Sequence, residues 1–286
     1  MNLNKERVLV VGLGDVGRPL LELLKESEHF AVYGFDINEE KMREVGQTTV
    51  PSKVDVMHVC IPCVSRGEFV NAVAGYVKRF KPRLVIVNST VPAGTTMEVH
   101  KRCGCLVAHS PVRGVHESLE HMKWELKRWT RYVGGADAES VEAARKHFEA
   151  LGLKTKVLKS CTETELAKLF ETTYRAWMIA CFQEMHRISR HFGADFDGVV
   201  DFLEDTHRVR LDRPLMFPDV IGGHCLIPNT KLLLKSYDSE FLRLILKSNE
   251  KREGEIKDES IRGEVKRVRR RVEALQVELM SKLGNQ

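Results

Sequence analysis

A cysteine that follows two glycines is the first feature of this chain that could carry chemistry. Residues 221–229 read IGGHCLIPN, with His224 directly before Cys225. A thiolate is a strong nucleophile near neutral pH, and a neighbouring imidazole can lower the pKa of a thiol or act as a base. Gly222 and Gly223 allow the backbone to approach a ligand closely. The segment therefore predicts either a catalytic nucleophile or a structural thiol in a tight turn.

A glycine-rich turn near the start of the chain could hold a phosphate. Residues 7–11 form a short apolar run, Gly12, Gly14 and Gly17 follow as G-x-G-x-x-G, and leucines at helical spacing come next. In this order the first glycine makes the turn, the second admits a pyrophosphate, and the third lets the helix pack on the strand. A second expected strand ends at Asp36, whose carboxylate can bind ribose hydroxyls and repel a 2′-phosphate. The pattern predicts a dinucleotide site that prefers NAD to NADP.

Strands and helices alternate through the first half of the chain. Further strands are expected at 54–62, 83–90, 105–111, 131–135 and 155–159, with helices near 66–80, 94–102 and 137–150. This alternation predicts an α/β fold with a Rossmann-type parallel sheet. Ligands bind such sheets in the crevice at the carboxyl ends of the strands. The expected cofactor-binding residues are Gly12, Gly14, Asp15, Val16, Gly17, Asp36, Ile37, Ile61, Pro62, Ser89 and Thr90.

The second half is predicted to be mostly helical and built on one long helix. Residues 162–192 contain neither Gly nor Pro, and their apolar residues occupy several faces, as in a helix at the centre of a domain or dimer. Thr162 and Glu165 have the spacing of an N-terminal capping box. A shorter helix is expected near 195–204, followed by an irregular, arginine-rich segment. Residues 263–283 predict an amphipathic helix that could serve as a coiled-coil or docking element.

The composition is that of a globular chain without a membrane span. The chain has 286 residues, of which 43% are hydrophobic and 30% charged, with a net charge of +5. No apolar run approaches the roughly 20 residues that a span needs, and the chain enters a strand almost at once, so we expect no signal peptide. The mild charge permits an anionic small-molecule substrate and disfavours nucleic acid as a partner. Binding of nucleic acid by the arginines at 267–271 stays an alternative to a solvated helix face.

The seven cysteines indicate a reducing compartment. Their number is odd and they are scattered, which argues against a disulfide framework and for a cytoplasmic protein. Cys60 with Cys63 and Cys103 with Cys105 have spacings that could hold zinc. The first pair, however, lies where a buried strand runs into a loop, and free cysteine is commonly buried. We therefore expect no metal site.

Four motifs in order resemble the UDP-glucose/GDP-mannose dehydrogenase family. STVPAGTT at 89–96, SPVRGVH at 110–116, ELAKLFETTYRA at 165–176 and GGHC at 222–225 follow the expected NAD fold. The resemblance spans about residues 7–235. It implies oxidation of a sugar-nucleotide alcohol to a carboxylate with two NAD and no metal. The alcohol could be that of a sugar or of a sugar nucleotide.

The resemblance also implies roles for single residues. Cys225 would attack the intermediate aldehyde as a thiolate, Lys168 on the long helix would stabilise the oxyanion, and Thr90 would help position water. The expected catalytic set is Cys225, Lys168, Thr90, Asn229, Thr172 and His224. Arginine suits anionic substrates well. The expected substrate-binding residues are Arg113, His116, Arg175, Gly222 and Gly223.

The chain departs from the family pattern at three positions. Val112 stands where the family has a water-binding glutamate, Asn229 where it usually has an aspartate, and Thr172 where it usually has an asparagine. Thr172 and Asn229 can form hydrogen bonds, but neither is a base at pH 7. A two-electron dehydrogenase of the β-hydroxyacid type, which needs no cysteine, therefore stays open. A non-catalytic NAD-binding protein that docks a partner through its C-terminal helix is a third interpretation.

Three parts are expected along the chain. Residues 1–160 would bind NAD, residues 161–248 would form a helical dimerisation and substrate domain with the GGHC loop, and residues 249–286 would be a charged helical tail. The residues after Pro228 are too few for the family's C-terminal nucleotide-binding domain. We expect a homodimer in which the long helix pairs with its own copy.

Overall fold

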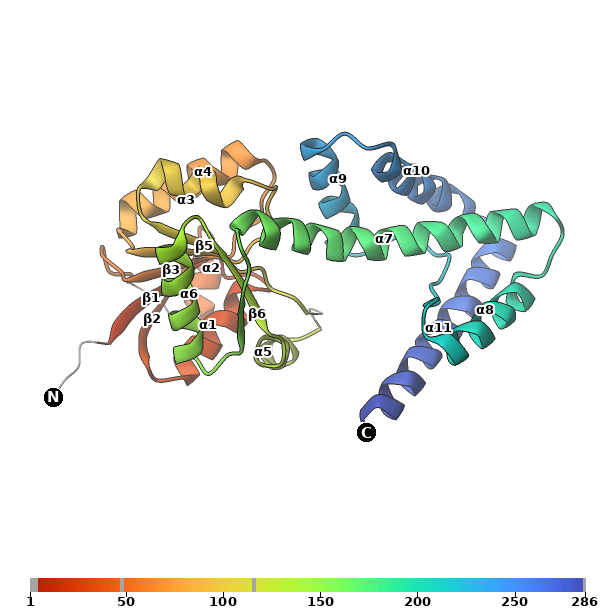
Figure 1. Cartoon of the computed structure of the whole chain (residues 1–286), viewed down its shortest axis with the longest axis horizontal. Coiled ribbons are helices and arrows are strands. Elements are labelled where there is room, and N and C mark those ends of the chain that lie inside the picture. The colour runs from red at the N-terminus through yellow and green to blue at the C-terminus, as the bar shows by residue number, and fades with distance from the viewer. Residues whose placement is uncertain (1–4, 47–48, 115–116, 285–286) are drawn as a thin grey trace. The chain divides into compact units, whose positions relative to one another are not determined.

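A computed structural model describes residues 5–46, 49–114 and 117–284 of the chain, with side chains as far as residue 279. The chain divides into two compact units, Met1–Leu169 and Phe170–Gln286. Figure 1 shows the first in red to green and the second in green to blue. The boundary falls inside the long helix, which begins in the first unit and continues into the second.

Seven strands form one sheet within the described part of the first unit. They are β1 (Glu6–Val11), β2 (Phe30–Phe35), β3 (Val56–Val59), β4 (Leu84–Val87), β5 (Leu106–His109), β6 (Arg131–Gly135) and β7 (Thr155–Val157). Their order is β2-β1-β3-β4-β5-β6-β7, and the first five are parallel. The expected α/β fold of Rossmann type is confirmed.

The expectation that all strands run parallel is wrong at β6, which is antiparallel to β5. Arg131, the first residue of β6, donates a hydrogen bond at 2.6 Å to the carbonyl oxygen of Ser110, just beyond β5. The chain therefore starts β6 at the edge where β5 ends, so β6 has to run back along it. β7 then pairs with β6 in parallel.

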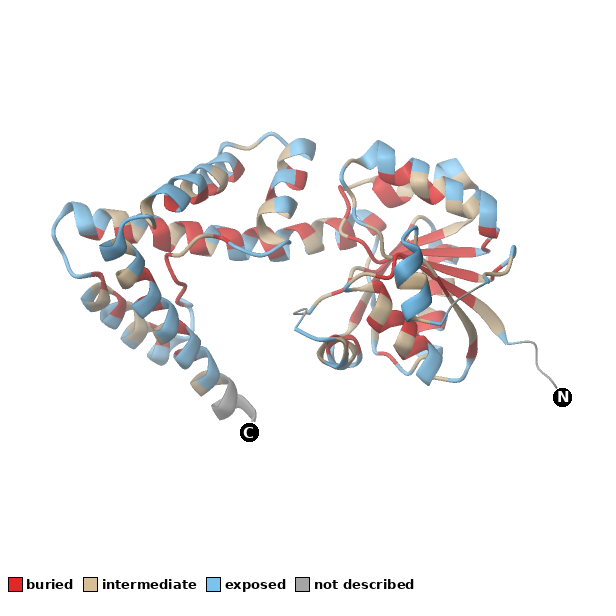
Figure 2. Cartoon of the chain, turned by 180° about the vertical axis from the view of Figure 1, so that it is seen from behind, coloured by how far each residue is buried: buried red, intermediate tan, exposed pale blue. Residues whose placement is uncertain are grey.

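Helices cover both faces of the sheet (Figure 1). Helices α1 (Gly17–Glu26), α5 (Leu119–Arg128) and α6 (Ala138–Ala150) pack on one face, and α3 (Arg66–Phe80) and α4 (Thr95–Cys103) pack on the other. Val8 and Val10 of β1 face the first group, whereas Leu9 and Val11 face the second. This alternation is what a strand buried on both sides requires, and the central strands β3 and β4 are buried along their whole length (Figure 2). The short helices α2 (Glu39–Glu44) and α5 were not expected from the sequence.

The second unit is helical. It contains most of α7 (Cys161–His191), with α8 (Phe196–Arg210), α9 (Leu226–Ser236), α10 (Glu240–Glu255) and α11 (Glu259–Gly284). The long helix and the C-terminal helix are confirmed, but α8 extends six residues beyond the expected end at 204. Helix α9 begins directly after the GGHC segment, where no helix was expected.

The apolar stripe of α11 is used inside its own unit. Val265, Val268, Val272 and Leu275 are buried, and α11 packs against α8. Two arginines of the stripe's polar border pair with carboxylates of the same unit, Arg267 with Asp197 at 3.0 Å and Arg269 with Asp219 at 2.6 Å. This packing accounts for the pattern without a docked partner. None of the described helices is long and apolar enough to cross a membrane.

Candidate active site

The glycine turn after β1 is built for close approach. Gly12 has a positive φ of 88°, and a side chain there would meet the carbonyl oxygen of Cys60 at 2.8 Å. A Cβ on Gly17 would lie only 1.7 Å from the carbonyl oxygen of Gly12, so the start of α1 packs directly on the turn. A Cβ on Gly14 would meet no described atom nearer than Lys41 Nζ at 4.0 Å. Two glycines are therefore required by the fold, while Gly14 leaves space for a ligand.

Asp36 lies at the carboxyl end of β2, next to this turn. One carboxylate oxygen accepts a hydrogen bond from Leu13 N at 2.7 Å, and the other accepts one from Asn38 N at 2.9 Å. The side chain is partly exposed, and Ile37 after it is 84% exposed. Asp15 is exposed and Val16 is half-buried at the start of α1. The structure thus brings the expected glycines and the acidic residue to one edge of the sheet.

The loops after β3 and β4 complete this edge. Ser89 Oγ donates a 2.6 Å hydrogen bond to the carbonyl oxygen of Ile61, which ties the two loops together. Pro62 is exposed and Thr90 is half-buried beside them. Burial raises the pKa of Cys60, in the same loop, to about 12, so its thiol stays protonated. All the expected cofactor-binding residues lie in the first unit.

Glu165 has a different task from the one that the sequence predicted. Its carboxylate accepts hydrogen bonds from Gly94 N at 2.6 Å, Thr96 N at 2.7 Å and Thr96 Oγ1 at 2.6 Å, and so caps α4 rather than its own helix. The capping box with Thr162 is therefore wrong. At the start of α7, Ser160 Oγ accepts from Glu163 N at 3.2 Å instead. Burial raises the pKa of Glu165, although the three donors oppose this shift.

His109 supports the same loop from inside the sheet. Its Nε2 lies 3.1 Å from the carbonyl oxygen of Ser89, and its Nδ1 lies 2.8 Å from Thr164 Oγ1. A carbonyl can only accept, so Nε2 carries the proton of the neutral ring. Burial lowers the pKa of His109 to about 4, which keeps the ring neutral. The imidazole, at the end of β5, thus holds the Ser89 backbone.

In the second unit, Cys225 is the N-cap residue of α9. Its carbonyl oxygen accepts from Asn229 N at 2.9 Å, which closes the first turn of the helix. The side-chain amide of Asn229 donates to Thr172 Oγ1 on α7 at 3.2 Å. Gly223 has a positive φ of 81°, and both glycines and His224 are exposed. The structure therefore brings together Cys225, Asn229 and Thr172 from the expected catalytic set.

Buried contacts fix the segment that leads into Cys225. Gln183 of α7 donates to the carbonyl oxygen of Asp219 at 2.7 Å. Asn249 of α10 accepts from Ile221 N at 2.6 Å. The sequence did not predict these two hydrogen bonds, because each joins residues that lie far apart along the chain. They hold the backbone on either side of residue 220 and so define where α9 starts.

The remaining expected residues have varied surroundings. The Arg113 guanidinium lies 4.8 Å from the Trp129 ring and 5.0 Å from the Tyr132 ring, and it donates to the carbonyl oxygen of Thr130 at 2.8 Å. Arg175 is exposed on α7, and Val112 is buried. His116 lies outside the described residues. Lys168 is half-buried on α7, in the first unit, whereas Cys225 belongs to the second.

Metal-binding geometry is not found in the part of the chain that is described. No three or more of its His, Cys, Asp and Glu side chains are grouped so that they could hold a metal ion. The seven cysteines are all free thiols.

Comparison with known proteins finds similar dehydrogenases. Residues 162–251 match the UDP-glucose/GDP-mannose dehydrogenase family, central domain. UDP-N-acetyl-D-mannosamine dehydrogenase from Methanocaldococcus jannaschii is 28% identical over 86% of this chain and 65% of its own length. The chain is similar to the UDP-glucose/GDP-mannose dehydrogenase family over the family's central domain. The family match covers the GGHC segment, α9, and most of α7 and α10, so the resemblance read from the motifs is confirmed.

A further relative is also a sugar-nucleotide dehydrogenase by name. UDP-N-acetyl-D-glucosamine 6-dehydrogenase from Pseudomonas aeruginosa is 26% identical over 77% of this chain and 60% of its own length. The chain thus spans about two thirds or less of these relatives.

Solved structures share the fold. UDP-D-ManNAc dehydrogenase from Pyrococcus horikoshii superposes with a TM-score of 0.70 at 24% identity, over 85% of this chain and 68% of that one. A 3-hydroxyisobutyrate dehydrogenase from Mycobacterium tuberculosis gives a TM-score of 0.64 at 19% identity, over 89% of this chain and 94% of that one.

Proposed function

We propose that this protein is an NAD-dependent dehydrogenase that oxidises the alcohol of a sugar or sugar nucleotide. The observation that carries the proposal is the cradle at the ends of β1 and β2. There only glycine fits at position 17, because a Cβ would lie 1.7 Å from the Gly12 carbonyl oxygen, whereas the space beside Gly14 is open. The Asp36 carboxylate is held by two backbone N–H donors. Similarity to the central domain of a dehydrogenase family supports the reaction class. The relatives named for UDP-N-acetylmannosamine make that sugar nucleotide the first candidate substrate.

The residues of the cradle fit NAD. The open space at Gly14, with the N-terminus of α1 behind it, suits a pyrophosphate, because backbone N–H groups and the helix dipole favour an anion there. The partly exposed Asp36 carboxylate would accept hydrogen bonds from ribose hydroxyls and would repel a 2′-phosphate. When bound, NAD supplies a hydride acceptor.

Cys225 is the nucleophile in the proposed mechanism. After a first oxidation of the alcohol, the thiolate adds to the aldehyde carbon, and the carbonyl oxygen becomes the oxyanion of a thiohemiacetal. Loss of a second hydride from that carbon leaves a thioester, and water then releases the carboxylate and the free thiol. The exposed His224 next to Cys225 is the candidate base that takes the thiol proton.

Lys168 and Thr90 serve the reacting oxygens in this proposal. Lys168 lies one helical turn before Thr172 on α7, so both side chains share a face of the helix. Its ammonium would stabilise the oxyanion, and the half-buried Thr90 would position water. Arg113, His116, Arg175, Gly222 and Gly223 remain the candidate substrate-binding residues. The Arg113 guanidinium lies against the rings of Trp129 and Tyr132.

A two-electron dehydrogenase of the β-hydroxyacid type is the second candidate. Two observations favour it: Val112 is buried and apolar, and the Asn229 amide is engaged with Thr172. Neither residue can activate water as a carboxylate does, and a missing general base costs roughly 10²–10⁴ in rate. In that case the reaction would end after one hydride transfer and would not use Cys225.

We also propose a homodimer formed through α7. Phe170, Tyr174 and Trp177 lie at helical spacing and are at least 39% exposed, and Phe241 of α10 extends the same patch, with its ring 5.4 Å from that of Trp177. Exposed apolar patches of this kind mark interfaces. The seven free thiols support our expectation that the protein acts in a reducing compartment such as the cytoplasm.

The function is tested by a substrate screen. Alcohols, β-hydroxyacids, sugars and UDP-sugars would be incubated with the protein and NAD, and NADH formation would be followed by absorbance. We expect turnover with a UDP-N-acetylhexosamine. Tight NAD binding without turnover on any compound would instead support a non-catalytic NAD-binding protein.

A further inference from the structure

A continuous chain of buried polar side chains runs through the first unit beside the sheet. It links Arg131 of β6, Asn88 after β4, His58 of β3 and His147 of α6, each of which is at most 5% exposed. Nothing in the proposed reaction uses these four side chains. Burying so many polar groups is costly unless every hydrogen bond is satisfied, so the chain calls for a functional explanation.

The direction of every hydrogen bond in the chain is fixed from the Arg131 end. Arg131 can only donate, so the Asn88 oxygen, 3.0 Å away, is the acceptor. The Asn88 amino group then donates to the carbonyl oxygen of Ile86 and to His58 Nδ1, both at 3.1 Å. His58 therefore carries its proton on Nε2 and donates it to His147 Nε2 at 2.9 Å. A neutral His147 is left with its proton on Nδ1.

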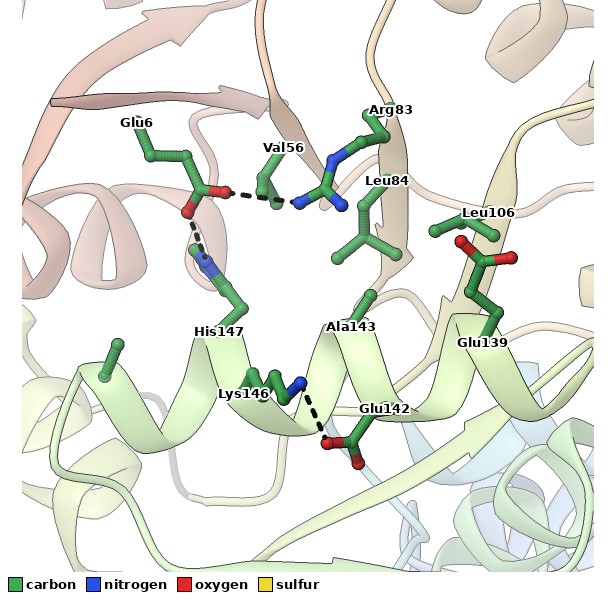
Figure 3. A pocket seen from close by; sticks show the side chains of 11 residues that line it. Glu6, Val56, Arg83, Leu84, Leu106, Glu139, Glu142, Ala143, Lys146 and His147 are labelled. Atoms are coloured by element: carbon green, nitrogen blue, oxygen red, sulfur yellow. Dashed lines mark ion pairs between the residues drawn. The ribbon is translucent and has the colours of Figure 1, made fainter. Parts of the chain in front are cut away.

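The outer end of the chain opens at a pocket. His147 Nδ1 is buried and finds no hydrogen-bond partner among the described residues, and its nearest acceptor is Glu6 Oε2 at 3.5 Å. Figure 3 shows His147 and Arg83 both pointing at the Glu6 carboxylate. These residues line a cavity of about 380 Å³ at the amino ends of the strands, with Glu139, Glu142 and Lys146 on its α6 side. Solvent protons therefore have a route to Glu6, next to the imidazole.

The inner end of the chain adjoins the proposed cofactor loop. Asn88 directly precedes Ser89 and Thr90, and its N–H donates to the carbonyl oxygen of Val59 at 2.9 Å. Ser89 in turn holds Ile61. The backbone of Asn88 is thus joined directly to the loops that follow β3 and β4.

We propose that Asn88 is a positioning residue for the NAD-binding loop and that the His58–His147 pair makes this positioning sensitive to protons arriving from the Glu6 pocket. If His58 takes an added proton, its Nδ1–H faces the amino group of Asn88. If His147 takes the proton, its Nε2–H faces the Nε2–H of His58. Turning the Asn88 amide to accept from His58 would point its amino group at Arg131, which is itself a donor. The network has no fully satisfied arrangement in its protonated form.

The surrounding charges set the range in which this happens. His58 faces His147 and Arg131, and burial together with both neighbours holds the pKa of His58 well below its usual range. His147 faces the Glu6 carboxylate, with Arg83 and Lys146 at the same pocket. Arg131 forms no ion pair with any described carboxylate, so the inner end carries an uncompensated positive charge. His58 is accordingly neutral at neutral pH, and the network becomes strained only when strong acidification adds a proton to it.

This inference rests on the proposed function, because it assumes that NAD binds at the Ser89–Thr90 loop. NAD affinity would be measured at about pH 8 and about pH 4.5 in the wild type and in His147→Gln, whose amide keeps an acceptor for His58 and cannot take a proton. The wild type should lose affinity on acidification by about fivefold or more beyond the loss in the variant. Glu139→Gln, in the same pocket without a contact to His147, should behave like the wild type. Equal pH dependence in the wild type and His147→Gln would overturn the inference.

A second measurement needs no NAD and separates the two proposals. Nitrogen NMR of the wild-type histidines should find the proton of His58 on Nε2 and that of His147 on Nδ1 at about pH 8, and acidification should shift the side-chain amide signal of Asn88. The opposite tautomers, or an unmoved Asn88 signal, would overturn the link itself. Absence of NAD binding at both pH values, with these tautomers present, would contradict the proposed function instead.

Discussion

At the scale of single residues, Asp36 combines two tasks. Its carboxylate orders the glycine turn through Leu13 N and the start of α2 through Asn38 N, and in the proposed site it also recognises the ribose. Asp36→Ala should weaken NAD binding roughly 10- to 100-fold, because hydrogen bonds to a charged acceptor are lost. It should also narrow the preference for NAD over NADP. Calorimetric titration with both cofactors checks this, with Glu39→Ala on α2 as the control; a wild type that binds both equally would contradict our interpretation of Asp36.

His109 predicts how the stability of the protein responds to acid. Its folded-state pKa is about 4, below the usual value near 6.5, because the ring is buried. Below about pH 6.5 the unfolded state binds a proton that the folded state refuses, so stability falls as the pH drops toward about 4 and is unaffected above 6.5. This group alone should cost on the order of 3 kcal/mol over that range. Denaturant unfolding of the wild type and His109→Gln should show the weaker pH dependence in the variant; identical slopes would count against a buried neutral ring.

At the scale of elements, the turn between β1 and α1 contains one glycine that the fold requires and another that we expect to serve NAD binding. In Gly17→Ala the new methyl would lie 1.7 Å from the Gly12 carbonyl oxygen, so we expect a loss of several kcal/mol in unfolding free energy. Gly14→Ala should fold normally, since no described atom lies within 4.0 Å, yet bind NAD about tenfold more weakly because the pyrophosphate space is filled. Thermal melts and NAD titrations of both variants test the pair. An unchanged NAD affinity in Gly14→Ala would show that the space is not the cofactor site.

The same elements show what can be predicted from sequence. The glycine turn, the position of Asp36 and the long helix depend on residues close together in the chain. Local sequence patterns were therefore sufficient to predict them. Glu165 was misread because its partners at 94 and 96 lie about 70 residues away, while Thr162 offered a local alternative. The reversed direction of β6 likewise depends on the contact of Arg131 with Ser110. The motifs therefore named candidate site residues, but did not predict the buried contacts that hold them.

At the scale of the whole molecule, the proposed dimer depends on the aromatic face of α7. Trp177→Glu would place a charge in the centre of the patch formed with Tyr174 and Phe241, and burying that charge would cost more than the contact contributes. We expect the variant to be monomeric at micromolar concentration while the wild type is dimeric, as measured by light scattering after size exclusion. Phe202→Glu, at a more exposed aromatic position on α8, should leave the dimer intact. A monomeric wild type would refute the dimer.

The central claim, that Cys225 carries a four-electron oxidation, is tested most directly by counting NADH per molecule of UDP-N-acetylmannosamine consumed. The wild type should form two NADH and a carboxylate. Cys225→Ser should form no carboxylate and at most one NADH, because the alcohol-to-aldehyde step does not need the thiol. The unperturbed fold of the variant would be checked by its NAD affinity. One NADH per substrate in the wild type, or two in Cys225→Ser, would contradict the nucleophile and leave the two-electron dehydrogenase as the better interpretation.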